Sequence, residues 1–163
     1  FAYFPQMKFI FVLRDPVERA ISNYWWSFKN GLETVPFREA MRTEKNRTAQ
    51  YEGRWKVTRP FSYIERGIYI RYIREYLKFF PRESLLFLIT EELENSPEKV
   101  LDQVSNFLQV SRFKNIEPLR SNETFRPEDP DPETMKYLVN IFRESNSALE
   151  EFLGREINCW MKG

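Results

Sequence analysis

Two residues near the start of the chain, Arg14 and Ser22, have the types and the spacing needed to bind a phosphate group. Arg14 ends a short apolar run, and Ser22 follows on the second turn of a predicted helix. A guanidinium, a hydroxyl and a helix N-terminus together suit a phosphate monoester, because all three supply hydrogen-bond donors and two of them supply positive charge. This segment therefore predicts an anion-binding site.

Two elements must position these side chains: a buried strand over residues 9–13 and a helix that begins directly after it. The run is apolar throughout, which is typical of a strand in a parallel sheet that is covered on both faces. Asp15, Pro16 and Glu18 are the residue types of an N-cap, a first helical position and a capping-box acid. Arg14 is then expected at the carboxyl end of the strand, where open α/β sheets bind their ligands.

The same residues allow a purely structural interpretation. Arg14 can form an ion pair with Asp15 or Glu18, and Ser22 can face solvent on the helix. Arginines at strand ends and capped helices are common, so residue chemistry by itself leaves both interpretations open.

The order of residues 9–24 resembles the superfamily of sulfotransferases that use 3′-phosphoadenosine 5′-phosphosulfate (PAPS), especially its heparan-sulfate-type and bacterial members. Weaker similarity covers most of the rest of the chain, at residues 67–69, 76–81, 85–93, 96–97, 104–108, 146–149, 153–155 and Trp160. The resemblance implies an α/β fold in which helices flank a parallel sheet, with a P-loop nucleotide-kinase-like architecture.

The resemblance also implies roles for individual residues. Arg14 and Ser22 would hold the 3′-phosphate of PAPS or of its product, 3′-phosphoadenosine 5′-phosphate (PAP). Related enzymes close a later loop over the nucleotide, which makes Arg120 and Arg126 further candidates, although the lysine–glycine pair of that loop is missing here. Tyr69 corresponds to a tyrosine near the acceptor cleft and is the candidate for substrate binding; packing of its ring against the sheet is the alternative.

Two parts of the family's machinery are expected before Phe1. One is the glycine- and lysine-bearing loop that binds the 5′-phosphosulfate, and the other is the catalytic base, a glutamate or histidine in such enzymes. This chain contains no histidine. We therefore expect residues 1–163 to form a single sulfotransferase-like domain, the C-terminal portion of the enzyme and inactive by itself, and we assign no catalytic residue.

The activity implied by the resemblance is transfer of a sulfuryl group from PAPS to a hydroxyl or amine, with a carbohydrate as acceptor and with no metal or redox cofactor. Two other classes remain open. A P-loop kinase-like enzyme would need a phosphate loop with a lysine and a magnesium-binding acid, and neither is readable here. A non-catalytic α/β domain that binds a nucleotide or a glycan needs neither.

Charge and composition argue against several partners. Lys and Arg number 25 against 24 Asp and Glu, so the net charge of +1 gives no chain-wide argument for nucleic acid or membrane surfaces. No apolar run is long enough to span a membrane. A lone Cys159 excludes an internal disulfide, which favours a bacterial cytoplasm over the Golgi lumen, and the lack of histidine argues against zinc.

Two later stretches bear on the acceptor side. Residues 42–60 are polar and basic, and they predict an irregular loop that guides a polyanionic acceptor such as a glycosaminoglycan; a solvated surface loop is the alternative. A helix is predicted over residues 61–80. Gly67 inside it lowers helix stability, so a close contact at that point would give this glycine a reason.

A second strand is predicted over residues 84–90, and the acids Glu91 and Glu92 follow it. Paired acids at a strand end can act in acid–base chemistry, but they more often hold a turn. A helix beginning at Ser96-Pro97 and a long closing helix, capped by Asp131 and ended by Gly154, complete the predicted elements.

Overall fold

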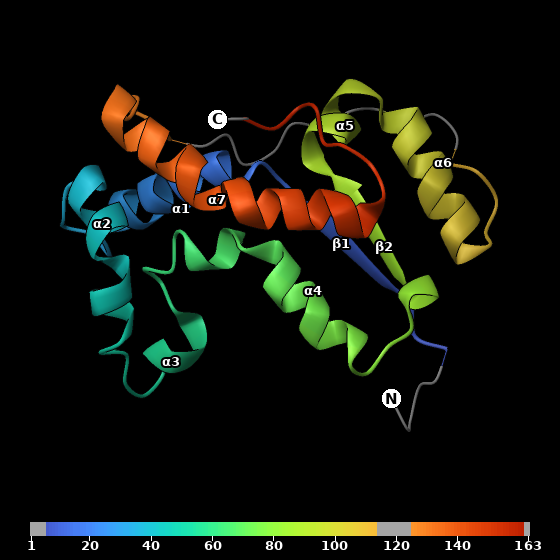
Figure 1. Ribbon diagram of the computed structural model, residues 1–163, viewed down its shortest axis with the longest axis horizontal. Helices are drawn as coiled ribbons and strands as arrows, with labels where there is room; N and C mark the ends of the chain where they lie inside the picture. Colours follow the sequence, from blue (N-terminus) through green and yellow to red (C-terminus); the bar gives the residue numbers. More distant parts are fainter. Residues whose placement is uncertain (1–5, 114–124, 162–163) are drawn as a thin grey trace. The chain divides into compact units, whose positions relative to one another are not determined.

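The structure is a computed structural model, and it describes residues 6–113 and 125–161 (Figure 1). The chain divides into two compact units. The first unit comprises Phe1–Asp15 and Ile70–Ser121, and the second comprises Pro16–Tyr69 and Asn122–Gly163. The prediction of a single domain over residues 1–163 stays a prediction.

The first unit is built on a parallel pair of strands, β1 (Phe9–Leu13) and β2 (Leu85–Ile89), paired in register from Phe9 with Leu85. A short 3₁₀ turn, η2 (Arg82–Ser84), leads into β2. Because parallel strands run the same way, their carboxyl ends meet at one edge of the sheet. The predicted α/β fold with a parallel sheet flanked by helices is thus confirmed, and β1 has the bounds that its apolar run predicts.

Helix α4 (Tyr69–Leu77) covers one face of this strand pair. The ring of Tyr76 lies 5.5 Å from that of Phe9 and 5.0 Å from that of Phe11. Phe11 in turn stacks on Phe87 of the neighbouring strand at 5.1 Å. Aromatic pairs at these separations add to the stability that burial gives. These aromatic rings therefore form the packing between α4 and the strand pair.

The opposite face is covered over β2 alone. Two helices follow β2, α5 (Thr90–Asn95) and α6 (Pro97–Leu108), and α6 packs Val100 and Val104 against Leu88. On β1 the side chains of that face, Ile10 and Val12, remain 39% and 57% exposed. The expectation that β1 is covered on both faces is wrong for this face, because an apolar run shows what prefers burial and not how far a covering helix extends.

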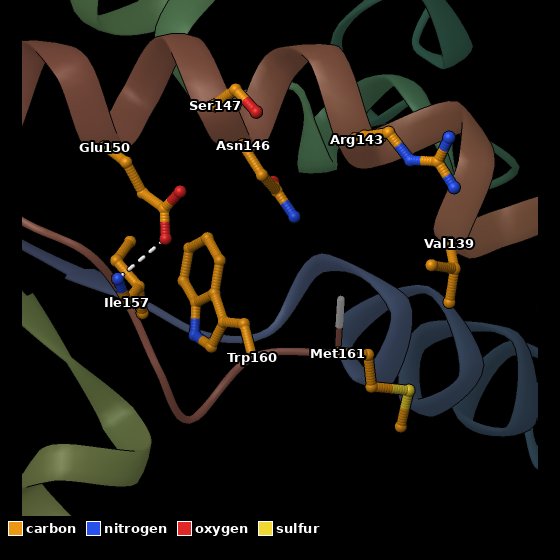
Figure 2. A pocket seen from close by; sticks show the side chains of 8 residues that line it. All are labelled: Val139, Arg143, Asn146, Ser147, Glu150, Ile157, Trp160 and Met161. Atoms are coloured by element: carbon orange, nitrogen blue, oxygen red, sulfur yellow. Dashed lines mark hydrogen bonds between the residues drawn. The ribbon is translucent and has the colours of Figure 1, made fainter. Parts of the chain in front are cut away.

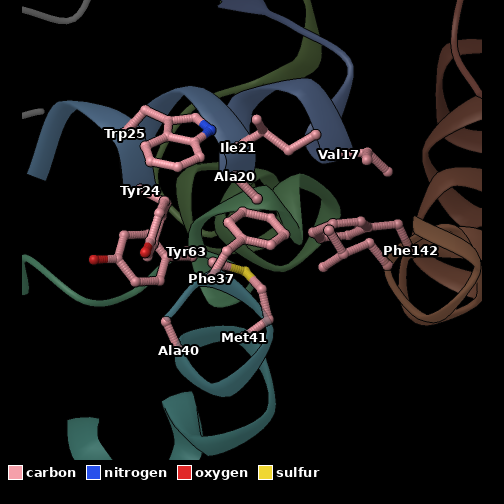
Figure 3. Close-up of a cluster of buried hydrophobic side chains, with 11 residues drawn as sticks. Val17, Ala20, Ile21, Tyr24, Trp25, Phe37, Ala40, Met41, Tyr63 and Phe142 are labelled. Carbon is pink, nitrogen blue, oxygen red and sulfur yellow. The ribbon is translucent and has the colours of Figure 1, made fainter. Parts of the chain in front are cut away.

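The second unit is helical. Its elements are α1 (Pro16–Lys29), α2 (Phe37–Thr48), α3 (Trp55–Thr58), the 3₁₀ turn η1 (Glu65–Gly67) and α7 (Pro132–Leu153). Its core is formed by side chains from α1, α2, α7 and the segment just before η1 (Figure 3). These residues are Val17, Ala20, Ile21, Tyr24, Trp25, Phe37, Ala40, Met41, Tyr63, Leu138 and Phe142. The ends of α7 are as predicted, because Asp131 accepts from the Thr134 amide at 2.9 Å and Gly154 adopts φ +68°.

The basic stretch over residues 42–60 is not one irregular loop. Helix α2 continues through its first part to Thr48, and α3 forms another turn within it. Glu44 accepts hydrogen bonds from the amides of Ile64 at 2.6 Å and Glu65 at 2.8 Å. These partners are distant in sequence, so a local pattern of polar residues cannot reveal them.

The helix predicted over residues 61–80 is divided at Gly67, where η1 ends before α4 begins. A Cβ at Gly67 would lie 2.7 Å from Cε1 of Phe142 and 3.0 Å from Cβ of Pro16. Real Cβ atoms do not approach carbon atoms so closely, so only glycine fits there. The predicted close contact at Gly67 is confirmed.

Candidate functional site

Arg14 directly follows β1, and the peptide groups on both of its sides are held from the end of β2. The Thr90 hydroxyl donates to the carbonyl of Leu13 at 3.0 Å. The amide of Asp15 donates to Oε1 of Glu91 at 2.9 Å. Because one bond precedes Arg14 and the other follows it, the backbone that presents this guanidinium is fixed within the first unit.

The second of these bonds bears on the role of Glu91, one of the two acids after β2. Glu91 holds the turn after β1, as the structural interpretation predicts. The sequence pattern also predicts Glu18 as the acceptor for the Asp15 amide. In the structure that amide donates to Glu91 of α5, and Glu18 bonds to Arg126.

Ser22 lies on the second turn of α1 and is half-buried. Residues three, four and seven positions away share its side of a helix, which here are Glu18, Trp25 and Lys29. The core side of α1 carries Val17 and Ile21, each 1% exposed, and extends as far as Trp25, which is 4% exposed. The prediction that Ser22 lies off the apolar stripe is confirmed.

Phe125 and Arg126 contact the residues that flank Ser22 on α1. Nη1 of Arg126 lies 3.0 Å from Oε2 of Glu18, one turn before Ser22. The ring of Phe125 contacts that of Trp25 at 6.4 Å, and Nζ of Lys29 lies 5.7 Å from its centroid. The second unit therefore brings Arg126, a predicted ligand of the nucleotide, to the side of α1 that carries Ser22.

The charge of Arg126 is already compensated in this arrangement. Besides Glu18, its guanidinium contacts Asp129 at 2.8 Å. A phosphate bound beside Ser22 would have to share Arg126 with these carboxylates. Arg120, the other predicted arginine, lies outside the described residues. The convergence of Arg14 and Ser22 on one phosphate stays a prediction.

Tyr69, the predicted acceptor-site residue, begins α4 and has an aromatic neighbour near the end of the chain. Its ring centroid lies 5.9 Å from that of Trp160, with the planes tilted by 50°. Trp160 is buried, with 5% of its surface exposed. Sequence reasoning did not pair these residues, since they belong to segments that are far apart along the chain.

A buried carboxylate network in the second unit was also missed. Glu33 is 2% exposed and accepts from Arg47 at 2.9 Å, from the Tyr63 hydroxyl at 2.7 Å and from the amide of Val35 at 3.0 Å. Burial alone raises the pKa of Glu33, but these hydrogen bonds outweigh it and hold the pKa below its ordinary value. Such a network stabilises the ionised acid, so its role is structural.

Glu44 shows the opposite balance. Burial raises its pKa above the ordinary value, and the amide bonds from Ile64 and Glu65 offset only part of that effect. A buried acid with a raised pKa can serve in proton transfer. Both carboxylate oxygens of Glu44 already accept hydrogen bonds from backbone amides at the start of η1. The arrangement therefore favours a structural role.

Within residues 6–113 and 125–161, no three His, Cys, Asp or Glu side chains gather in a way that would bind a metal ion. None of the helices in these ranges is long and apolar enough to cross a membrane.

The chain matches the family model described as "Sulfotransferase domain" over residues 2–129. It is 34% identical over 117 residues to heparan sulfate glucosamine 3-O-sulfotransferase 3B1 from Homo sapiens, a match that covers 72% of this chain and 28% of that protein. It is 26% identical over 180 residues to carbohydrate sulfotransferase 15 from Mus musculus, covering 98% of this chain and 32% of that protein.

A solved structure is also similar. The crystal structure of a sulfotransferase from Alicyclobacillus acidocaldarius matches with a TM-score of 0.76 and 27% sequence identity, covering 94% of this chain and 57% of that chain. This chain thus spans just over half of the bacterial structure and about a third or less of the two curated relatives.

Proposed function

This chain belongs to the sulfotransferase domain family, and we propose that it is part of an enzyme that transfers a sulfuryl group from PAPS to a hydroxyl or amine of a carbohydrate. The family and the fold support transfer of a sulfuryl group in general. The donor, the acceptor and the activity of the whole protein are the content of the proposal.

The observation that carries the donor assignment is the contact of Phe125 and Arg126 with the side of α1 that bears Ser22. PAPS differs from ordinary nucleotides in its 3′-phosphate, which asks for cationic and hydroxyl donors. Ser22 and Arg126 supply such donors from the second unit. Arg14 is a further donor of this kind, on a backbone that is held on both sides. Charge-assisted hydrogen bonds of this kind are stronger than neutral ones.

The reaction itself needs little covalent participation by these residues. The acceptor oxygen or nitrogen attacks sulfur, the bond between sulfur and the 5′-phosphate oxygen breaks, and PAP leaves with that electron pair. The acceptor's proton passes to a base, which is not assigned among the residues of this chain. Arg14, Ser22 and Arg126 would hold the donor at its 3′ end, so they contribute to positioning, on which group transfer of this type depends.

The names of the relatives support a carbohydrate acceptor, because they act on heparan sulfate glucosamine in one case and are called carbohydrate sulfotransferase in the other. The basic stretch over residues 42–60 includes the end of α2 and all of α3, and its exposed cations can attract a polyanion. A bacterial cytoplasmic location stays a prediction from the single cysteine.

Calorimetry with PAP and with ATP tests the donor assignment. We expect the chain to bind PAP and to bind ATP at least about tenfold more weakly. Arg14→Ala should weaken PAP binding by about 10- to 100-fold, since a hydrogen bond to a charged group contributes about 1.5–3 kcal/mol. Arg74→Ala is the matched control, because it removes an exposed cation from α4 in the same unit.

The Arg74→Ala variant should bind PAP within about twofold of the unsubstituted chain. Equal losses in the two arginine variants would show a general effect of charge and remove Arg14 from the site. Tighter binding of ATP than of PAP would support a kinase-like enzyme, and the absence of binding to both would overturn the assignment of a donor site to this chain.

A further inference from the structure

A cavity of about 200 Å³ lies in the second unit between α7 and the segment that ends the chain (Figure 2). Arg143, Asn146, Ser147 and Glu150 line it from α7. Their spacing of three and four residues places them on one side of the helix. Trp160 lines the cavity from the facing segment.

The wall formed by Trp160 is held in place by two contacts. Oε1 of Glu150 accepts from the amide of Ile157 at 2.7 Å, which holds the final segment against α7, as Figure 2 shows. The ring centroid of Tyr69 lies 5.9 Å from that of Trp160. Trp160 is 5% exposed, so a small and fixed part of its apolar surface borders the cavity.

Two polar side chains of the lining, those of Asn146 and Arg143, can form further hydrogen bonds. The amide of Asn146 points into the cavity beside the indole, and no hydrogen bond joins it to another described residue. Arg143 donates to Oδ1 of Asn140 at 2.7 Å, which is a neutral partner. No carboxylate among the described residues forms an ion pair with Arg143, and the one carboxylate of the lining, Glu150, accepts the bond from Ile157.

This combination selects a class of ligand. An apolar ligand would leave the Asn146 amide buried without a partner, which is unfavourable. A sugar ring presents C–H groups to an aromatic surface and hydroxyls to an amide, and a carboxylate or sulfate on that ring would pair with a guanidinium. The volume of about 200 Å³ suits one such ring and is below that of sites for drug-sized ligands.

We propose that this cavity binds one anionic sugar unit of the acceptor, with its charge at Arg143, its hydroxyls at Asn146 and Ser147, and its ring beside Trp160. The proposal rests on the carbohydrate acceptor of the proposed function and extends it to a binding site. Tyr69, predicted from the resemblance to lie near the acceptor, then acts through Trp160 by holding the indole in place.

The test uses the chain itself with two probes, a heparin-derived tetrasaccharide and the uncharged tetrasaccharide of N-acetylglucosamine. Binding is followed by calorimetry and by the indole N–H signal of Trp160 in ¹H–¹⁵N NMR spectra, identified with Trp160→Phe. Arg143→Gln should weaken the sulfated probe about tenfold and leave the uncharged probe unchanged. Asn146→Ala should weaken both probes several-fold.

Lys136→Gln is the matched control, because it removes one exposed charge from the same helix outside the cavity. It should change the affinity for the sulfated probe by no more than about twofold. Equal losses in Lys136→Gln and Arg143→Gln, or a Trp160 signal that does not respond to the sulfated probe, would overturn the proposal. A response of that signal to PAP in place of the saccharide would assign the cavity to the nucleotide and overturn it as well.

Failure of this site is distinguishable from failure of the donor site. Arg143→Gln should bind PAP as tightly as the unsubstituted chain, because Arg143 lies outside the residues proposed for the 3′-phosphate. Loss of saccharide binding with PAP binding retained would affect the cavity alone. A chain that binds the saccharide through Arg143 but not PAP would retain the cavity and lose the donor assignment.

Discussion

The two units of this chain use polar side chains in opposite ways. In the first unit the interior is formed by strand residues and aromatic rings, and the polar bonds that Thr90 and Glu91 form lie at the strand ends beside Arg14. In the second unit the carboxylates of Glu33 and Glu44 lie inside, 2% and 5% exposed. Polar bonds in the first unit thus hold a candidate ligand residue, while those in the second hold the core itself.

The largest effect that separates the two units is expected from Glu33→Gln. It removes the negative charge to which Arg47 and the Tyr63 hydroxyl donate hydrogen bonds. Removing one partner of a buried ion pair costs about 3 kcal/mol or more. Urea unfolding measures the change. Glu133→Gln is the control, since it breaks exposed pairs with Arg38 and Arg42 and should cost less than about 1 kcal/mol.

The pH dependence of the two buried acids should differ in sign. The pKa of Glu33 is lowered from its ordinary 4.5 on folding, so its contribution is present above pH 4.5 and is lost as the pH falls further. The pKa of Glu44 is raised, so its ionisation above pH 4.5 reduces the free energy of unfolding. The free energy of unfolding of the unsubstituted chain minus that of Glu33→Gln should decrease on acidification. The corresponding difference for Glu44→Gln should increase. Parallel trends would contradict this assignment.

A smaller effect is expected from Gly67→Ala, which tests the packing of the second unit. The added methyl would meet the buried ring of Phe142, and overpacking of this kind costs about 1–3 kcal/mol. Thermal unfolding should show the loss. Combining it with Phe142→Leu should recover part of the stability relative to the sum of the single changes. Strict additivity in this double-mutant cycle would show that the two residues do not compete for space.

The smallest change in stability is expected in the first unit, from Thr90→Val. Loss of its bond to the Leu13 carbonyl costs about 1 kcal/mol, because a single neutral hydrogen bond contributes about that much. If this bond positions Arg14, the affinity for PAP measured by calorimetry should also fall several-fold. Thr58→Val removes an exposed hydroxyl bonded within its own helix turn and should leave PAP binding unchanged. An unchanged affinity in Thr90→Val would show that the bond is purely structural.

The sequence predicted those features that depend on neighbours within a few positions. The apolar run of β1, the Pro16 start of α1, the position of Ser22 off the apolar stripe, the Asp131 cap and the Gly154 end all follow local rules of periodicity and capping. The helix wrongly extended over residues 61–80 is informative, since Gly67 marks the break and the ring that its missing Cβ would meet, Phe142, lies far along the chain.

The pairings that build the candidate sites could not be predicted in this way. Glu91 meets the Asp15 amide across 76 positions, and Arg126 meets Glu18 across 108. Bonds at such separations depend on which elements pack together, and no residue pattern within either segment specifies its partner. The same holds for Tyr69 and Trp160, and for the cavity beside them.

The sequence by itself determined the residue types for an anion site, the order of strand and helix around them, and the resemblance that gave them a function. Only the tertiary structure decided which side chains hold the backbone beside Arg14, which acids are buried, that Ile10 and Val12 remain exposed, and that Arg143 and Trp160 line one cavity. The physical reason is range: dihedral preference and periodicity act along a few residues, whereas burial, charge compensation and cavity shape are properties of segments brought together by folding.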